Sequence, residues 1–257
     1  MDIHETAIVH PKARIDKGVK IGPYSIIGEY VKIGRGTVVG PHVVIKGWTT
    51  IGGDNRIFQF ASIGEINQDL KYRGEETHLE IGERTTIREY VTMQIGTEAG
   101  GGLTKVGDDN LFMNYSHVAH DCIIGNGCIM ANVATLGGHI TIDDGAIIGG
   151  MVGIHQFCRV GRLAIIGGCS KVTQDIPPFM MADGPRAVVR GVNLVGLKRR
   201  DFSEKVINGL KRAYRILYRS GLNVSQAVEK MEAEPERIPE VVELAEFIKG
   251  SERGIAK

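Results

Sequence analysis

The chain has 257 residues, of which 42% are hydrophobic, so it can bury a core and is not a disordered protein. Its 31 basic and 30 acidic residues leave a net charge of +1, which argues against binding nucleic acid or a membrane surface over the whole molecule. Four cysteines without a C-x-x-C pair argue against a zinc knuckle or a disulfide scaffold, and the lack of a leader or of an apolar run near ~20 residues predicts a cytoplasmic protein without a membrane span.

The first part of the chain repeats with a period of six residues. An aliphatic residue recurs at every sixth position, glycine often follows it, and a small or β-branched residue often stands two positions before it. Each hexad therefore predicts one short strand and one turn. The aliphatic positions of this run are Val9, Ile15, Ile21, Ile27, Ile33, Val39, Ile45, Ile51, Ile57 and Ile63.

Two inserted loops, near 65–78 and 95–104, interrupt the period without ending it. The first preserves the phase, because the aliphatic positions resume three hexads after Ile63. The second insertion adds one residue to two hexads. The period then runs on to Val172, and Pro177-Pro178 is expected to stop it.

Hexads joined by tight turns predict a triangular prism, in which residue i stacks under residue i+18 at roughly 4.8 Å, the spacing of neighbouring strands. The period does not fix the handedness, but known hexapeptide-repeat proteins coil to the left. We therefore predict an all-β left-handed parallel β-helix over residues 1–190. Cys122, Cys128 and Cys158 share the hexad position of Ala61, so we expect them to be small core side chains.

Beyond residue 190 the period becomes helical. One apolar face recurs at helical spacing, Ser203 can cap the start of this helix, and Gly221 can end it. Two shorter helices follow near 225–233 and 239–249, so residues 191–257 predict a small α-helical C-terminal domain. The apolar face consists of Val206, Ile207, Leu210, Ala213, Tyr214, Leu217 and Tyr218.

The stretch 190–220 is strongly basic, with nine lysines and arginines against two acidic residues. Two interpretations are open. The basic residues can form a solvated helix face that is balanced by the acidic segment 229–246, or they can bind phosphates or an acidic partner. Composition alone does not choose between the two.

Four of the eight histidines, His117, His120, His139 and His155, lie close together in the second part of the repeat. The last three lie in hexads that are offset by 18 residues, so they share one face of the prism on successive coils. We expect them to form a vertical column with roughly 5 Å per step. A single surface histidine is usually only a polar residue, but three on one face favour a functional role.

Two chemical roles fit this column. A neutral imidazole can take a proton from a hydroxyl nucleophile, with Asp121 or a backbone carbonyl holding the tautomer of His120. Alternatively, histidines from neighbouring faces can bind a metal ion, as in the carbonic anhydrases built on a similar prism. His117 and His120 make a weak metal pair, because pleating and the corner between them point the rings in different directions. We therefore favour the base.

Several loop motifs are more specific than the repeat itself. They are Gln59–Gly64 leading into Asn67–Tyr72, Gly100–Gly107, His120-Asp121-Cys122, Ile147–Met151, His155–Cys158, Gly191-Val192-Asn193 and Gly196–Arg200. Through these motifs the chain closely resembles, nearly end to end, the UDP-N-acetylglucosamine acyltransferases that begin lipid A synthesis in Gram-negative bacteria.

The resemblance implies a homotrimer with active sites in clefts between adjacent prisms. The implied reaction moves a (R)-3-hydroxyacyl chain from acyl carrier protein to the 3-hydroxyl of UDP-N-acetylglucosamine, and no metal or organic cofactor is expected. By motif, His120 would be the general base, with Asp121 beside it. The backbone N–H of Gly138 would help to stabilise the tetrahedral oxyanion.

The resemblance also implies a set of substrate-binding residues. The sugar and acyl portions would be held by Gln68, Asp69, Lys71, His117 and His139, with His155 and Gln156 nearby. The nucleotide and its phosphates, which a guanidinium fork suits, would meet Asn193, Arg199 and Arg200. The basic helix would then have a partner, because acyl carrier protein is acidic.

Gly168 matches the position that sets acyl length in the family. It lies three coils from the hexad of His117, or roughly 14 Å along the prism. Because glycine leaves the groove open there, we predict a longer hydroxyacyl donor.

Three residues depart from the family pattern. Val195 stands where many members carry an acidic residue near the nucleotide, and Gln94 and Ile95 stand where histidine and arginine are expected. Some relatives accept a sugar with an amine at position 3, so the acceptor can be the 3-hydroxyl sugar or its 3-amino analogue. The related N-acyltransferase would need an extra N-terminal domain, for which hexads that begin by Val9 leave no room. A metal-dependent enzyme and a structural scaffold without activity are weaker alternatives.

Overall fold

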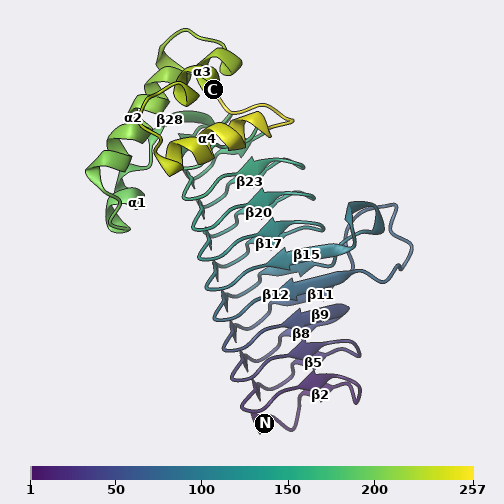
Figure 1. Ribbon diagram of the computed structural model, residues 1–257. Coiled ribbons are helices and arrows are strands. Elements are labelled where there is room, and N and C mark those ends of the chain that lie inside the picture. The colour runs from purple at the N-terminus through teal and green to yellow at the C-terminus, as the bar shows by residue number, and fades with distance from the viewer. Residues whose placement is uncertain (1) are drawn as a thin grey trace.

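The computed structural model describes residues 2–257 and consists of a tall parallel β-helix with helices at its C-terminal end (Figure 1). Most strands are only two residues long, because the chain turns sharply after the aliphatic position of each hexad. Every third strand along the chain joins the same sheet, so three sheets form the three sides of a prism.

The three sheets are parallel from coil to coil over the length of the prism. The first sheet contains β1 (Asp2–Ile3), β4 (Lys20–Ile21), β7 (Val38–Val39), β10 (Arg56–Ile57), β13 (Thr86–Ile87), β16 (Leu111–Phe112), β19 (Ile129–Met130), β22 (Ile147–Ile148), β25 (Ile165–Ile166), β27 (Met180–Asp183) and β28 (Val188–Val192). The second contains β2 (Ile8–Val9), β5 (Ile26–Ile27), β8 (Val44–Ile45), β11 (Ser62–Glu65), β14 (Thr92–Gln94), β17 (His117–Val118), β20 (Thr135–Leu136), β23 (Gly153–Ile154) and β26 (Lys171–Val172). The third contains β3 (Arg14–Ile15), β6 (Lys32–Ile33), β9 (Trp48–Ile51), β12 (His78–Ile81), β15 (Leu103–Val106), β18 (Ile123–Ile124), β21 (Thr141–Ile142) and β24 (Arg159–Val160).

Outside the two inserted loops, coils stack with the 18-residue spacing that the repeat predicts; Ile129, for example, pairs with Ile147. From Ile21 onward the aliphatic position of each hexad points into the prism and is buried. The prediction for the three core cysteines is confirmed, since Cys122, Cys128 and Cys158 are all buried. Burial raises the pKa of the Cys122 thiol to about 12, as expected for an inert core side chain.

Many corners of the prism are made by a residue in the left-handed conformation, which non-glycine residues rarely adopt. The side chains at these corners point outward and stack on one another from coil to coil. The longest stack lies between the first and second sheets, where neighbouring ring centroids are 4.7–5.4 Å apart. Its rings are those of Tyr24, His42, Phe60, Tyr90 and Tyr115, and we call it the aromatic ladder.

The two predicted insertions are present and leave the third sheet continuous. The first loop, 66–77, precedes β12, and the second, 95–102, contains a short 3-10 helix at Glu98–Gly100. His78 at the end of the first loop pairs with both Trp48 and Leu103. Both loops leave the prism at the edge where the second sheet meets the third, and they lie side by side (Figure 1).

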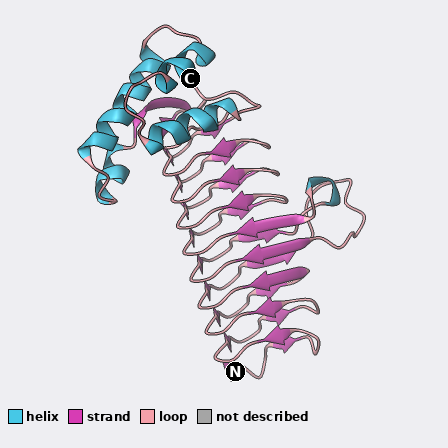
Figure 2. Ribbon diagram, viewed as in Figure 1, coloured by secondary structure: helices cyan, strands magenta, loops and turns pink. Residues whose placement is uncertain are grey.

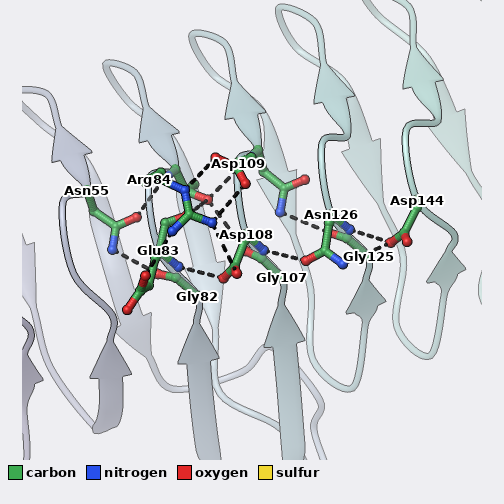
Figure 3. Close-up of polar contacts among 12 residues, drawn as sticks. Asn55, Gly82, Glu83, Arg84, Gly107, Asp108, Asp109, Gly125, Asn126 and Asp144 are labelled. Carbon is green, nitrogen blue, oxygen red and sulfur yellow. Dashed lines mark hydrogen bonds and ion pairs between the residues drawn. The ribbon is translucent and has the colours of Figure 1, made fainter. Parts of the chain in front are cut away.

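Polar side chains secure the stacking at the edge between the third and first sheets (Figure 3). The side chains of Asp108, Asn126 and Asp144 each accept the backbone N–H of a residue in the preceding coil, at 2.6–2.8 Å. Arg84 adds ion pairs to Asp108 and Asp109. Backbone groups that the two-residue strands leave free are therefore satisfied by side chains.

The parallel coils end differently from the prediction. The chain does stop its regular coiling at Pro177-Pro178, but β27 still pairs in parallel with β25, and β28 then turns back as its antiparallel neighbour. The sequence did not predict this hairpin.

Four helices cover the C-terminal end of the prism (cyan in Figure 2). They are α1 (Leu194–Arg199), α2 (Glu204–Arg219), α3 (Val224–Glu232) and α4 (Pro239–Lys249). Ser203 caps α2 as predicted by accepting the N–H of Val206, and Gly221 follows that helix with a φ of 75°. Helices α3 and α4 match the two predicted helices within one residue, whereas α1 was not predicted. Among residues 2–257, no helix has the length and apolar character needed to cross a membrane.

Part of the basic stretch pairs with the acidic segment, as the first of the two interpretations proposed. Lys205 and Arg212 on α2 form ion pairs with Glu236, at 2.7 and 3.5 Å. Lys198, Lys211 and Arg215 are not part of these pairs. Binding of phosphates or of an acidic partner, the second interpretation, is therefore left to the remaining basic residues.

Arg162 connects the prism to α4 through an ion pair with Glu243. Its guanidinium donates to both carboxylate oxygens of Glu243, at 2.9 and 2.7 Å, and its centre lies 4.8 Å from the ring centroid of Phe179. We expect Arg162→Ala to lower the free energy of unfolding by about 1 kcal/mol, because a half-exposed ion pair and a cation–π contact each contribute modestly. Thermal unfolding at fixed protein concentration measures this change. Lys12→Ala, which removes an exposed ion pair with Glu29, is the control and should unfold like the wild type.

Candidate active site

A groove of about 1060 Å³ follows the edge where the second sheet meets the third. The first inserted loop forms one of its walls, and the strands β17, β20, β23 and β26 form its floor. The structure therefore brings together most of the residues that the sequence singled out. The predicted residues that line the groove are Gln68, Asp69, Lys71, His117, His120, Gly138, His139, His155 and Gln156.

His120 and Asp121 form a buried pair at one side of this groove. The Nδ1 atom of His120 lies 2.7 Å from Oδ2 of Asp121, and the His120 residue is 8% exposed. Because an ionised carboxylate can only accept, the proton of the neutral ring is on Nδ1. The Nε2 atom is then an unprotonated acceptor, and it is the ring nitrogen left to act on a molecule in the groove.

Asp121 is held from the other side by the second inserted loop. Its carboxylate accepts the backbone N–H and the hydroxyl of Thr97, at 2.9 and 2.6 Å. Burial by itself would raise the pKa of Asp121, but the hydrogen bonds from His120 and Thr97 outweigh it and hold the pKa below its ordinary value. Asp121 is therefore ionised at neutral pH.

Two further histidines adjoin His120. Nδ1 of His117 lies 2.6 Å from the hydroxyl oxygen of Thr92, and burial, together with the neighbouring His120, lowers the pKa of His117. His117 is therefore neutral at pH 7. The ring of His139 meets that of His120 edge-on, with centroids 5.1 Å apart.

The predicted column of three histidines needs a correction. His139 does lie one coil above His120, but the next ring is that of Phe157, stacked on His139 at 4.5 Å. The hexads are offset by 18 residues as predicted, yet the three histidines occupy different positions within them. His139 and Phe157 both stand at the left-handed corner position, whereas His155 lies two residues earlier and lines the groove separately.

Gly138 lies against the His120 ring. A Cβ atom at this position would lie 2.4 Å from Cε1 and 2.7 Å from Nε2 of His120, so only glycine leaves room for the ring. The N–H of Gly138 has no acceptor among residues 2–257. Gly138 is the second residue after its strand. In other coils this position is occupied by proline, which has no N–H, so the fold does not require a hydrogen bond from it. These prolines are Pro11, Pro23 and Pro41.

Four predicted residues lie outside the groove of the same chain. Asn193 is buried, caps α1 by accepting the N–H of Gly196, and donates to the carbonyl of Leu163. Arg199, the last residue of α1, and Arg200, its C-cap, are exposed. Gly168 lies against Gly150 at the edge between the first and second sheets.

The residues that depart from the family pattern are placed differently from one another. Gln94 lines the groove, is 6% exposed, and its Oε1 atom has no hydrogen-bond donor among residues 2–257. Ile95 beside it is 1% exposed and belongs to the core. Val195 is 62% exposed on α1.

One group in the described chain has the composition of a metal site. The ligand atoms of His120, Asp121 and His139 all lie within 4.8 Å of one another. However, Oδ2 of Asp121 already accepts hydrogen bonds from both His120 and Thr97. A metal ion would have to displace these bonds, so the geometry fits a histidine–carboxylate pair better than a metal centre.

A prism of stacked hexads with a histidine–carboxylate pair in a lateral groove fits a hexapeptide-repeat transferase in which a histidine takes a proton from a hydroxyl nucleophile. Residues 12–47 and 103–138 match a family model described as bacterial transferase hexapeptide (six repeats), and residues 175–256 match one described as Udp N-acetylglucosamine O-acyltransferase, Domain 2. The acyl-(acyl-carrier-protein)–UDP-N-acetylglucosamine O-acyltransferase of Janthinobacterium sp. (strain Marseille) is 52% identical over 99% of both chains. The chain therefore belongs to the UDP-N-acetylglucosamine O-acyltransferase family.

Solved structures agree with this assignment. LpxA of Acinetobacter baumannii is 47% identical over 99% of both chains, with a TM-score of 0.97. LpxA of Bacteroides fragilis, a UDP-N-acetylglucosamine acyltransferase, is 45% identical over 99% of both chains, also with a TM-score of 0.97. The predicted fold class, a left-handed parallel β-helix with a small helical C-terminal part, is confirmed, and the protein is an acyltransferase.

Proposed function

We propose that this protein transfers a (R)-3-hydroxyacyl chain from acyl carrier protein to the 3-hydroxyl of UDP-N-acetylglucosamine, the first step of lipid A biosynthesis. The observation that carries this proposal is the His120–Asp121 pair, which leaves Nε2 of His120 free to accept a proton beside the groove. The family to which the chain belongs supplies the substrate class.

His120 is the general base in this reaction. Its Nε2 takes the proton of the 3-hydroxyl while the sugar oxygen bonds to the carbonyl carbon of the acyl thioester. The carbonyl oxygen becomes an oxyanion that accepts the free N–H of Gly138. The carbon–sulfur bond then breaks, and the imidazolium returns its proton to the departing thiolate. No step in this sequence uses a metal or an organic cofactor.

The other groove residues bind the substrates. Asp69 and Lys71 on the first loop, with Gln68, line the same groove as the histidines and hold the sugar and acyl portions together with His117 and His139. His155 and Gln156 extend the groove by one coil. Arg199 and Arg200, with Asn193 supporting their helix, supply the positive charge that nucleotide phosphates need.

We infer a homotrimer that completes the site. Arg200 lies beside Gly145, at the edge between the third and first sheets and away from the groove of its own chain. Arg199 and Arg200 would therefore meet the nucleotide in the groove of a neighbouring copy. The exposed aromatic ladder is the kind of apolar surface that a second copy would cover. Sedimentation should therefore give three times the mass of the chain.

The basic residues of the helical domain suggest the partner protein, and the free cysteines suggest the compartment. Acyl carrier protein is acidic, and the basic residues that remain outside the ion pairs of α2, such as Lys198, Lys211 and Arg215, form its docking surface. All four cysteines are free, which fits a reaction in the cytoplasm.

Gly168 is expected to set the acyl length. Gly168 lies outside the groove of its own chain, at the edge that carries the aromatic ladder, so we infer that it limits the acyl chain in the groove of a neighbouring copy. Gly168→Met would add a side chain there, so we expect the preferred donor to become shorter. Each methylene that loses its burial removes about 0.8 kcal/mol of binding. Competition between hydroxyacyl carrier proteins of graded chain length, read by mass spectrometry, measures the preference. An unchanged preference would show that the length is set elsewhere.

A transfer assay tests the function as a whole. Hydroxyacyl carrier protein is offered with UDP-N-acetylglucosamine or with its 3-amino analogue, and the products are identified by mass spectrometry. Product from the ordinary sugar supports the proposal. Product only from the amino sugar makes this an amide-forming enzyme, with the buried Gln94 in the groove as the first residue to exchange, and no product from either sugar would contradict the proposal.

A further inference from the structure

The Asp121 carboxylate is fully engaged by two residues. Its Oδ1 accepts the N–H of Thr97, and its Oδ2 accepts both the hydroxyl of Thr97, at 2.6 Å, and Nδ1 of His120, at 2.7 Å. The hydroxyl and the imidazole therefore share one oxygen atom. Whatever fixes that hydroxyl also fixes the acceptor to which His120 is bound.

The direction of the Thr97 hydroxyl bond follows from a third contact. The N–H of Gly100 donates to Oγ1 of Thr97 at 3.1 Å, so the hydroxyl oxygen acts as an acceptor there. The hydroxyl proton is consequently free to point at Asp121, which is ionised and can only accept. A continuous chain of hydrogen bonds thus runs from Gly100 through Thr97 and Asp121 to His120, and such chains polarise their members.

The second loop is built tightly around this carboxylate. A Cβ atom on Gly100 would lie 2.1 Å from Cγ of Asp121, and one on Gly96 would lie 2.9 Å from its Oδ1. The carbonyl of Gly96 in turn accepts hydrogen bonds from two side chains of the first loop, at 2.9 and 2.7 Å. Both loops therefore hold Thr97, which is 6% exposed, in one place.

We propose that Thr97 is a positioning residue for the acyl transfer: through Oδ2 of Asp121 it fixes the orientation of His120 and limits how strongly the carboxylate favours the protonated ring. The inference rests on the proposed role of His120 as the base. Thr97 itself touches no reacting atom.

The expected effect of removing the hydroxyl follows from electrostatics. Without the Thr97 donor, Oδ2 carries more of the negative charge, so it stabilises the imidazolium of His120 more strongly. The ring then takes up a proton at higher pH, and a smaller fraction remains as the neutral base at pH 7. Apart from Asp121, the titratable groups around the ring make no hydrogen bond with the Thr97 hydroxyl. They are His117 and His139 on the prism, Asp69 and Lys71 on the first loop, and His155 and Lys171 farther along the groove.

The test compares Thr97→Val with Thr97→Ser in the transfer assay over a range of pH. We expect the valine variant to lose roughly tenfold in kcat at pH 7, the usual scale of a hydrogen bond to a charged group, with little change in KM. The acidic limb of its pH profile should move to higher pH, and serine should restore both. A failure of serine to restore kcat, or a fall in kcat with neither the acidic limb nor the titration of His120 moved, would overturn the inference.

Thr37→Val is the matched control. Thr37 is also buried, and its hydroxyl likewise donates to a carbonyl and accepts an N–H, but it lies on coils remote from the groove. Its variant should keep the wild-type kcat and pH profile. A shift of the limb in Thr37→Val as well would show a general effect of losing a buried hydroxyl, and would also overturn the inference.

A second readout separates this inference from the proposed function. The imidazole carbons are labelled with ¹³C, the signal of His120 is assigned by its loss in His120→Ala, and its titration is followed by NMR. If the titration moves to higher pH in Thr97→Val but the rate profile does not, the proposed role of His120 as the base fails, while the link from Thr97 to His120 stands. If the titration does not move, the inference itself is wrong.

Discussion

Replacing His120 with alanine is expected to lower kcat by about 10²- to 10⁴-fold, the usual contribution of a general base. The substitution removes the only acceptor that the His120–Asp121 pair presents to the groove, and the neighbouring histidines are differently engaged. His117 lies against Thr92, and His139 stacks on Phe157. The fold should be unaffected, because the prism is held by the buried aliphatic positions and not by this corner.

The transfer assay measures kcat and KM for this variant, with circular dichroism and thermal unfolding as checks of the fold. His10→Ala is the control, because His10 is a corner histidine of an early coil, remote from the groove, whose Nδ1 accepts only the N–H of Lys12. The control should retain wild-type activity. A folded His120→Ala variant with more than about a tenth of the wild-type kcat would exclude the general-base role.

Replacing Gly138 with alanine is expected to lower kcat by about 10²-fold, the scale reported for a misplacement of 1 Å at a reacting group. The new methyl group would lie 2.4 Å from Cε1 of His120, far inside van der Waals contact. The imidazole must therefore move, which breaks its bond to Asp121 and displaces it from the free N–H of residue 138. A single methyl group would thus disturb both the proposed base and the proposed oxyanion donor.

Steady-state kinetics of Gly138→Ala should show this loss mainly in kcat. Gly191→Ala is the matched control, since a Cβ atom there meets nothing within 4 Å. A crystal structure of the variant locates the ring of His120 directly. Full activity with an unmoved ring would contradict the prediction that a methyl group at residue 138 displaces His120.

The repeat made most of the fold predictable. One aliphatic residue every six positions is sufficient to fix strand, turn and sheet, because neighbouring coils offer each other the same surface, and this pattern placed even Cys122, Cys128 and Cys158 correctly. The 18-residue register likewise explains why Asp121, His139 and Phe157 stand above one another. His155 is absent from this column, contrary to the prediction, because it lies two residues before the corner position that Phe157 occupies.

Structural features that do not follow the six-residue repeat could not be predicted as well from the sequence. The hairpin β27–β28 and the short helix α1 depend on contacts with the last coils and not on a pattern of their own. Asn193 was expected to bind the nucleotide, but within the single chain its side chain caps α1. Thr97 carried no sequence signal, because its value lies in a hydrogen bond to Asp121, 24 residues away in an irregular loop.

The 18-residue coil gives this protein a fixed unit of length. Because each coil adds one strand spacing of about 4.8 Å, inserting or deleting a whole coil between His120 and Gly168 would change their separation by that increment and leave the local surroundings of both intact. With the role proposed for residue 168, we expect substrate length to change in two kinds of step, a fine one made by one side chain at that residue and a coarse one made by a complete coil. In an ordinary globular enzyme no such increment exists, since the distance between two residues there depends on all the packing that separates them.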